Sequence, residues 1–139
     1  MILIIGGMGF IGLNTTVRCL EVGENVVITQ HSASRIPDAI KDEVGKRVFI
    51  ERMDVTNSFE VSAVFRKHPE IDRIISFAAP PARGISPEVD YYVYTSGLQN
   101  TLEAARNFGV KRTALASSQS VYSGLVAGPY HEDDLLLIE

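Results

Sequence analysis

Four glycines within seven residues, in the stretch GGMGFIG (6–12), carry the clearest chemical signal of this 139-residue chain. Gly7, Gly9 and Gly12 fit the spacing G-x-G-x-x-G, whereas Gly6, Gly9 and Gly12 fit G-x-x-G-x-x-G. Glycines let the backbone approach a phosphate closely, and the free N–H groups at the start of a following helix attract the anion. Either spacing predicts a loop that holds the pyrophosphate of a dinucleotide. A tight turn without a ligand is the alternative.

The residues at the end of an expected strand, 25–30, bear on which dinucleotide binds. Such sites for NAD usually have Asp or Glu there, because a carboxylate accepts a hydrogen bond from the ribose 2′-hydroxyl. This chain has Gln30 instead, followed by Ser32, Ser34 and Arg35 as candidate contacts of a 2′-phosphate. A carboxylate would repel that phosphate, whereas Arg35 would attract it. The sequence therefore slightly favours NADP over NAD, with a solvated polar loop as the alternative.

Three further strand ends carry residues that suit such a ligand. Asp54 follows the third expected strand, and its carboxylate can accept a hydrogen bond from an adenine amino group. Ala78 and Ala79 end the fourth strand, where small side chains allow a flat cofactor to lie against the backbone. Ser118 ends the fifth strand, where a hydroxyl can orient a substrate hydroxyl or carbonyl. A turn aspartate, plain packing and an ordinary loop serine are the respective alternatives.

A sheet must position these residues, because short β-rich runs alternate with longer helical stretches. The runs are apolar on both faces, which predicts a doubly wound α/β fold whose parallel sheet has about five strands. The expected strands are 2–5, 25–30, 47–53, 72–79 and 112–118. The expected helices are 10–23, 36–45, 58–68 and 86–109. Asn57 and Glu60 predict a capping box at the start of the third helix.

The last expected helix, 86–109, has the clearest start and stop signals. Ser86 can cap it, Pro87 suits its first position, and Gly109 suits its end. Its apolar residues recur at three- and four-residue steps, which predicts one buried face. The residues of this face are Tyr94, Leu98, Leu102, Ala105 and Phe108.

Composition narrows the class of protein. With 45% hydrophobic and 22% charged residues, the chain is expected to fold as one domain, 1–139. The fifth strand is expected to lie at the edge of its sheet. A net charge of −4 argues against a dedicated nucleic-acid binder, and no apolar run approaches the roughly 18 residues that cross a bilayer. Three scattered histidines and one cysteine indicate no metal cluster. The lone Cys19 favours a reducing, cytoplasmic setting.

Five ordered motifs make the chain resemble the extended short-chain dehydrogenase/reductase family, specifically its NAD(P)-dependent sugar-nucleotide epimerase and dehydratase group. The motifs are GGMGFIG, MDVTN, IISFAAPP, LQNTLEAARNFGVKR and ASSQSVYSG, within about residues 2–130. The resemblance implies a Rossmann-like fold, an NAD or NADP cofactor, and hydride transfer on a hydroxyl or carbonyl substrate such as a nucleotide-linked sugar. It also implies a candidate homodimer contact through the helix 86–109.

The resemblance favours the G-x-x-G-x-x-G spacing and assigns roles to individual residues. The implied cofactor contacts are Gly6, Gly9, Phe10, Ile11 and Gly12 at the pyrophosphate, Asp54 and Val55 at the adenine, and Ala78 and Ala79 at the fourth strand. Ser118 matches the family's catalytic Ser/Thr, which hydrogen-bonds the reacting hydroxyl. The chain would thus represent the amino-terminal, cofactor-binding portion of such an enzyme.

The chain also departs from the family pattern. Ile5 stands where the family usually has Thr, Gln30 where it has Asp, and Tyr94 where it has Asn. The family's Tyr-x-x-x-Lys base would follow PYHEDD (129–134), and Tyr130 has no Lys four residues further on. We therefore expect weak cofactor binding and little or no turnover by these 139 residues. A non-catalytic NADP-binding sensor or regulatory protein of the same fold is the main alternative, and a methyltransferase is a weaker one.

Overall fold

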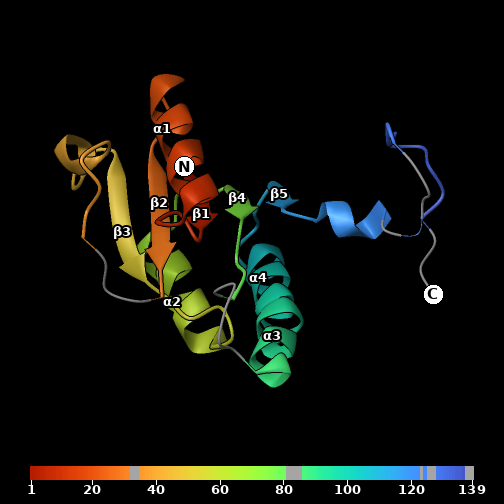
Figure 1. The fold of residues 1–139 in the computed structure, drawn as a ribbon. Helices are drawn as coiled ribbons and strands as arrows, with labels where there is room; N and C mark the ends of the chain where they lie inside the picture. The colour runs from red at the N-terminus through yellow and green to blue at the C-terminus, as the bar shows by residue number, and fades with distance from the viewer. Residues whose placement is uncertain (32–34, 81–85, 123, 125–127, 137–139) are drawn as a thin grey trace.

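A computed structural model describes residues 1–31, 35–80, 86–122, 124 and 128–136, and its centre is a five-stranded parallel sheet (Figure 1). The strand order is β3-β2-β1-β4-β5. The strands are β1 (Ile2–Ile5), β2 (Val26–Gln30), β3 (Val48–Arg52), β4 (Arg73–Ser76) and β5 (Arg112–Leu115). The chain reverses its direction of travel across the sheet after β3, so β1 and β4 meet at a topological switch point. All five expected strands are confirmed.

Helices cover both faces of the sheet, which confirms the doubly wound α/β fold. The elements are α1 (Phe10–Glu21), α2 (Ser58–Lys67), α3 (Pro87–Tyr94) and α4 (Ser96–Asn107), with short 3-10 turns η1 (Lys41–Glu43) and η2 (Gln119–Tyr122). Leu3 and Val27 lie in the apolar cluster beneath α2 and α4. Ile4 and Ile28 lie in the cluster beneath α1. The central strands are therefore apolar on both faces, as buried parallel strands must be.

The start of α2 fixes the loop that follows β3. The Asn57 side-chain oxygen accepts hydrogen bonds from the N–H groups of Phe59 and Glu60, at 3.1 and 3.4 Å, so the expected cap is confirmed. The Glu60 carboxylate accepts from the Asp54 N–H at 2.8 Å and from the Asn57 amide at 3.0 Å. This variant of the capping box ties Asp54, in the loop after β3, to the first turn of α2.

The helix expected over 36–45 is wrong, since the structure has only the turn η1 there. Ile40 is buried, and its N–H donates to the Pro37 carbonyl at 3.2 Å in a turn. Gly45 has a φ of +78°, which is outside the helical region. A helix of this length is marginal unless tertiary packing supports it, and the segment has few buried apolar side chains to provide that support.

The single helix expected over 86–109 is also wrong, because α3 and α4 meet at Thr95 with backbone angles of −95° and −66°. The Thr95 hydroxyl donates to the Tyr91 carbonyl at 2.6 Å, a side-chain bond that commonly bends helices. The outer boundaries are as expected: Ser86 accepts from the Val89 N–H, and Gly109 has a φ of +70°.

The buried face of α4 consists of small residues rather than the expected large ones. Gly97, Thr101, Ala104 and Ala105 are buried. Four of the five residues expected there are exposed, among them Phe108 at 38%, although its ring stacks on Phe65. The other three are Tyr94 at 56%, Leu98 at 40% and Leu102 at 43%. Of the expected face, only Ala105 is confirmed as buried. The small side chains of the observed buried face let this helix approach its neighbours closely.

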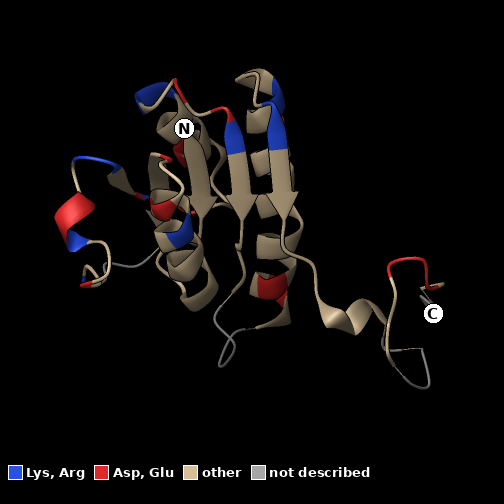
Figure 2. Ribbon diagram, turned by 90° about the horizontal axis from the view of Figure 1, so that it is seen from above, with Lys and Arg blue, Asp and Glu red and all other residues tan. Residues whose placement is uncertain are grey.

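β5 is an edge strand, as expected, and every one of its residues is exposed. After β5 the chain leaves the sheet, and η2 lies apart from it (Figure 1). The amino ends of β4 and β5 are basic, whereas their carboxyl ends are uncharged (Figure 2). At the amino edge Arg73 makes two 2.8 Å hydrogen bonds with Glu24. Within the described residues, no helix combines the length and hydropathy required to cross a membrane.

Candidate functional site

The loop between β1 and α1 is built on the close approach of glycine backbones. Gly6 has a φ of +77°, and its carbonyl accepts from the Gly9 N–H at 3.0 Å. Gly9 is then the N-cap of α1, since its carbonyl accepts from the Leu13 N–H at 2.8 Å. A Cβ on Gly12 would meet the Gly6 carbonyl oxygen and lie 2.7 Å from the Gly7 Cα. No side chain fits at Gly12 unless the loop opens.

Gly7 is equally constrained, although the favoured spacing leaves it out. It is buried, and a Cβ there would lie 2.6 Å from the Cβ of Ile28. Glycine at this position lets the loop lie directly on β2. Phe10 and Ile11 begin α1 and are 86% and 60% exposed, so their side chains leave the first turn of the helix open.

The end of β2 contacts the loop through a residue that the sequence reasoning missed. The Thr29 hydroxyl accepts from the Gly6 N–H at 3.2 Å. A threonine within an otherwise apolar run, VVIT, was the available signal. The next residue, Gln30, has a buried Oε1 with no hydrogen-bond partner among the described residues, a polar atom that a ligand can satisfy.

Asp54 is held by the loop after β3, with one carboxylate oxygen already occupied. Its Oδ1 accepts from both the N–H and the hydroxyl of Thr56, each at 2.8 Å. Its Oδ2 lies 3.6 Å from Nε2 of His31 at the end of β2. Burial raises the pKa of Asp54, but the Thr56 hydrogen bonds and the nearby His31 outweigh it and lower the pKa overall. Asp54 is therefore an ionised acceptor at neutral pH.

Val55, the other candidate for the adenine contact, is positioned by α4. The Asn100 side-chain amide donates to the Val55 carbonyl at 2.9 Å. A Cβ on Gly97 would lie 2.8 Å from Cγ2 of Val55, so only glycine lets the helix come this close. Sequence reasoning did not single out Gly97 or Asn100 as positioning residues.

The remaining candidates at the glycine-loop edge differ in their placement. Ala78 follows β4 and is half-buried, and its N–H donates to the Ser76 hydroxyl at 3.4 Å. Ala79 is exposed beside it. Arg35 is 87% exposed and pairs with Asp38 at 3.7 Å, so the structure does not bring it to Gln30. Two further candidates, Ser32 and Ser34, lie outside the described residues.

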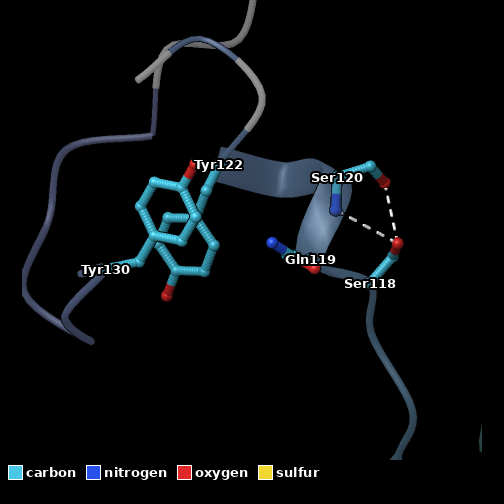
Figure 3. A pocket seen from close by; sticks show the side chains of 5 residues that line it. All are labelled: Ser118, Gln119, Ser120, Tyr122 and Tyr130. Carbon is cyan, nitrogen blue, oxygen red and sulfur yellow. Dashed lines mark hydrogen bonds between the residues drawn. The ribbon is translucent and has the colours of Figure 1, made fainter. Parts of the chain in front are cut away.

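Ser118 lies at a second, separate place, in a hollow of about 390 Å³ beyond β5 (Figure 3). Its Oγ is 2.8 Å from the Ser120 Oγ and accepts from the Ser120 N–H at 3.2 Å. The rings of Tyr122 and Tyr130 stack against each other on the opposite side, with centroids 5.2 Å apart. The structure therefore places Ser118 among hydroxyl groups but does not bring it to the glycine loop.

The geometry fits an extended anionic ligand with a base at one end. The glycine loop offers the start of α1 to a phosphate, and Gln30 and Asp54 offer acceptors along the carboxyl ends of β2 and β3. These ends lie at one edge of the parallel sheet, next to the switch point where open α/β sheets bind ligands. No cluster of metal-ligating side chains occurs in the described part of the chain.

Comparison with known proteins gives concordant matches. The model of the NAD dependent epimerase/dehydratase family matches residues 2–137. UDP-glucose 4-epimerase of Bacillus subtilis is 31% identical over 138 residues, covering 95% of this chain and 40% of that protein. The Drosophila melanogaster enzyme is 32% identical, with coverage of 87% and 38%. UDP-glucose 4-epimerase of Bifidobacterium longum, solved with NAD+ and UDP, matches with a TM-score of 0.81 and 28% identity, covering 95% and 41%.

Proposed function

The chain belongs to the NAD-dependent epimerase/dehydratase family, and we propose that residues 1–139 are one cofactor-binding domain of an enzyme that acts on a nucleotide-linked sugar. The chain spans about two fifths of the Drosophila and Bacillus epimerases, at 38% and 40% of their lengths. Substrate and activity are therefore proposals for the whole protein. The complex of the Bifidobacterium longum relative with NAD+ and UDP supports both ligand classes.

The observation that carries the proposal is the glycine loop, in which the Gly12 position has no room for a Cβ. We assign the pyrophosphate to this loop, with Gly6, Gly9 and the first amides of α1 around it. The adenosine half then runs over Gln30 towards Asp54, whose Oδ2, 3.6 Å from Nε2 of His31, would accept from the adenine amino group. When bound, the nicotinamide would supply hydride acceptance and return.

We assign Phe10 and Ile11 to the flank of the pyrophosphate. We assign Val55 to a place beside the adenine, and Ala78 and Ala79 to a place under the nicotinamide half. Ser118 would hydrogen-bond the reacting hydroxyl of the substrate. The single described cysteine, Cys19, is free and buried, which is consistent with the cytoplasmic location that we propose.

Both NAD and NADP fit the proposed site at the end of β2. Gln30 presents a neutral amide, which can accept from a 2′-hydroxyl through its oxygen or donate to a 2′-phosphate through its nitrogen. His31, 75% exposed, lies beside this site with its Nε2 3.6 Å from the Asp54 carboxylate. The family's NAD-bound relative supports NAD, and the missing carboxylate supports tolerance of NADP, the cofactor we favour slightly.

A binding titration tests the proposed function directly. We expect the 139-residue chain to bind both NADH and NADPH with dissociation constants on the order of 0.1–1 mM. Binding should be weak because only the dinucleotide site of this chain contributes, and turnover should be negligible. Calorimetry or the fluorescence of the reduced nicotinamide measures it, with ADP-ribose as competitor. Failure of both dinucleotides to bind at millimolar concentration would refute the proposal.

The outer face of α3 and α4 supports a homodimer contact. Tyr91, Tyr94, Leu98 and Leu102 are 65%, 56%, 40% and 43% exposed, which forms an apolar patch on two consecutive helices. Apolar patches of this kind on a folded domain mark interaction sites. We propose that a second copy of the chain covers this patch.

Replacing Leu98 and Leu102 together by serine should weaken self-association at least about tenfold, since each leucine buries apolar area worth 1.5 kcal/mol or more. Sedimentation equilibrium over a concentration series measures the change. Phe59→Ser is the matched control, because Phe59 is 82% exposed on α2, away from the patch. A wild-type chain that stays monomeric at all concentrations would contradict the contact.

A further inference from the structure

We propose that Thr29 is a positioning residue of the cofactor site, whose hydroxyl fixes the first peptide of the glycine loop. The inference rests on the proposed function, in which this loop holds the dinucleotide pyrophosphate. The Thr29 Oγ1 accepts from the Gly6 N–H at 3.2 Å, and Thr29 is only 2% exposed. The Gly6 N–H is partly buried, and a side chain of the neighbouring strand supplies its hydrogen-bond acceptor.

The need for this side chain follows from where the strand ladder ends. β1 pairs with β2 from Ile2↔Val26 to Ile4↔Ile28, and Gly6 lies just past the last of these pairs. Gly6 has turned to a φ of +77°. Its carbonyl accepts from the Gly9 N–H at 3.0 Å. The peptide units around Gly6 are thus held on both sides, by Thr29 at the amide and by the loop at the carbonyl.

Ile5, the residue before the loop, does not contribute a hydroxyl. It is 1% exposed and packs in the apolar cluster with Leu3 and Val27. Thr29 also directly precedes Gln30, whose side chain we assign to the adenosine ribose. Thr29 therefore sets the position of the glycine loop directly. Through Gln30, the next residue of β2, it also sets the position of the ribose contact. Pyrophosphate and ribose positions are coupled through Thr29.

Thr29→Val tests this role, because valine keeps the shape and removes the acceptor, leaving the Gly6 N–H unpaired. We expect hydrogen exchange of the Gly6 amide in the free protein to accelerate about tenfold or more, and affinity for NADH and NADPH to fall about tenfold. Thr29→Ser should restore both, since it returns the hydroxyl. Thr29→Ala, which also lacks the acceptor, serves if the valine variant does not fold.

Thr101→Val is the matched control. Thr101 is also 2% exposed, but its hydroxyl donates to the Gly97 carbonyl at 2.8 Å within α4, so its loss leaves no N–H unpaired. We expect the control to leave Gly6 exchange and cofactor affinity unchanged.

Unchanged Gly6 exchange in Thr29→Val would overturn the inference, and so would faster exchange with unaltered affinity, which would reduce Thr29 to a structural role. If the unmodified chain binds neither dinucleotide, the proposed function fails instead. The exchange measurement needs no cofactor, and it still decides in that case whether Thr29 holds the loop.

Discussion

Replacing Gly12 by alanine is expected to reduce affinity for NADH and NADPH at least about a hundredfold, roughly 2.7 kcal/mol of binding free energy. The added Cβ would meet the Gly6 carbonyl oxygen and lie 2.7 Å from the Gly7 Cα, and both are backbone atoms that cannot rotate away. The loop must open, which moves the amides at the start of α1 away from the phosphate. The free energy of unfolding should fall by about 1–3 kcal/mol from overpacking.

Gly109→Ala is the control that separates affinity from stability. Gly109 has a φ of +70° with open space around its Cβ position, so alanine there introduces backbone strain of about 1–2 kcal/mol without a clash. We expect similar destabilisation in urea but unchanged cofactor affinity. If Gly12→Ala binds NADH as tightly as the wild type, the glycine loop is not the pyrophosphate site.

Replacing Gln30 by aspartate should make the chain selective for NAD. A carboxylate within about 5 Å of a 2′-phosphate in a half-exposed site adds roughly 1–3 kcal/mol of repulsion, equivalent to a loss of about 5- to 150-fold in NADPH affinity. NADH affinity should stay constant or rise, because the carboxylate accepts from the ribose 2′-hydroxyl. The ratio of the two dissociation constants, measured by calorimetry, reports the change.

Gln30→Asn is the matched control, since it shortens the side chain by the same amount and keeps it neutral. It should weaken both cofactors modestly without changing their ratio. Raising the salt concentration should reduce the selectivity of Gln30→Asp, because ionic strength screens the repulsion. An equal effect of aspartate on NADH and NADPH would place the ribose away from the end of β2.

The strands and the glycine loop were predictable because their signals are local. Buried parallel strands are continuous apolar runs such as ILII (2–5), and a loop that must approach a ligand needs glycine whatever surrounds it. The position of Asp54 followed from the same rule, because residues that end parallel strands collect at one edge. The cap at Asn57 was also readable, since its pattern spans only one turn of helix.

The missed features depend on contacts between segments distant in the sequence. The hydroxyl of Thr29 matters only because β2 lies beside β1, which places it next to Gly6. The pattern of large apolar residues in α4 pointed to Leu98 and Leu102, whereas the helix buries Gly97 against Val55 and two alanines in the core. Periodicity identifies a stripe of apolar residues but not whether that stripe meets the core or remains open.

α4 connects two surfaces of the molecule, because one side of the helix packs on Val55 and the other side is exposed. Gly97 and Asn100 contact Val55, while Leu98 and Leu102 face outward from the same turns. A molecule that restrains the outward face therefore restrains the residue next to Asp54 across the width of one helix. Where contact at that outer face strengthens adenosine binding, thermodynamic reciprocity requires that adenosine binding strengthen the outer contact by the same factor. Nucleotide binding and self-association of the protein would then be thermodynamically linked.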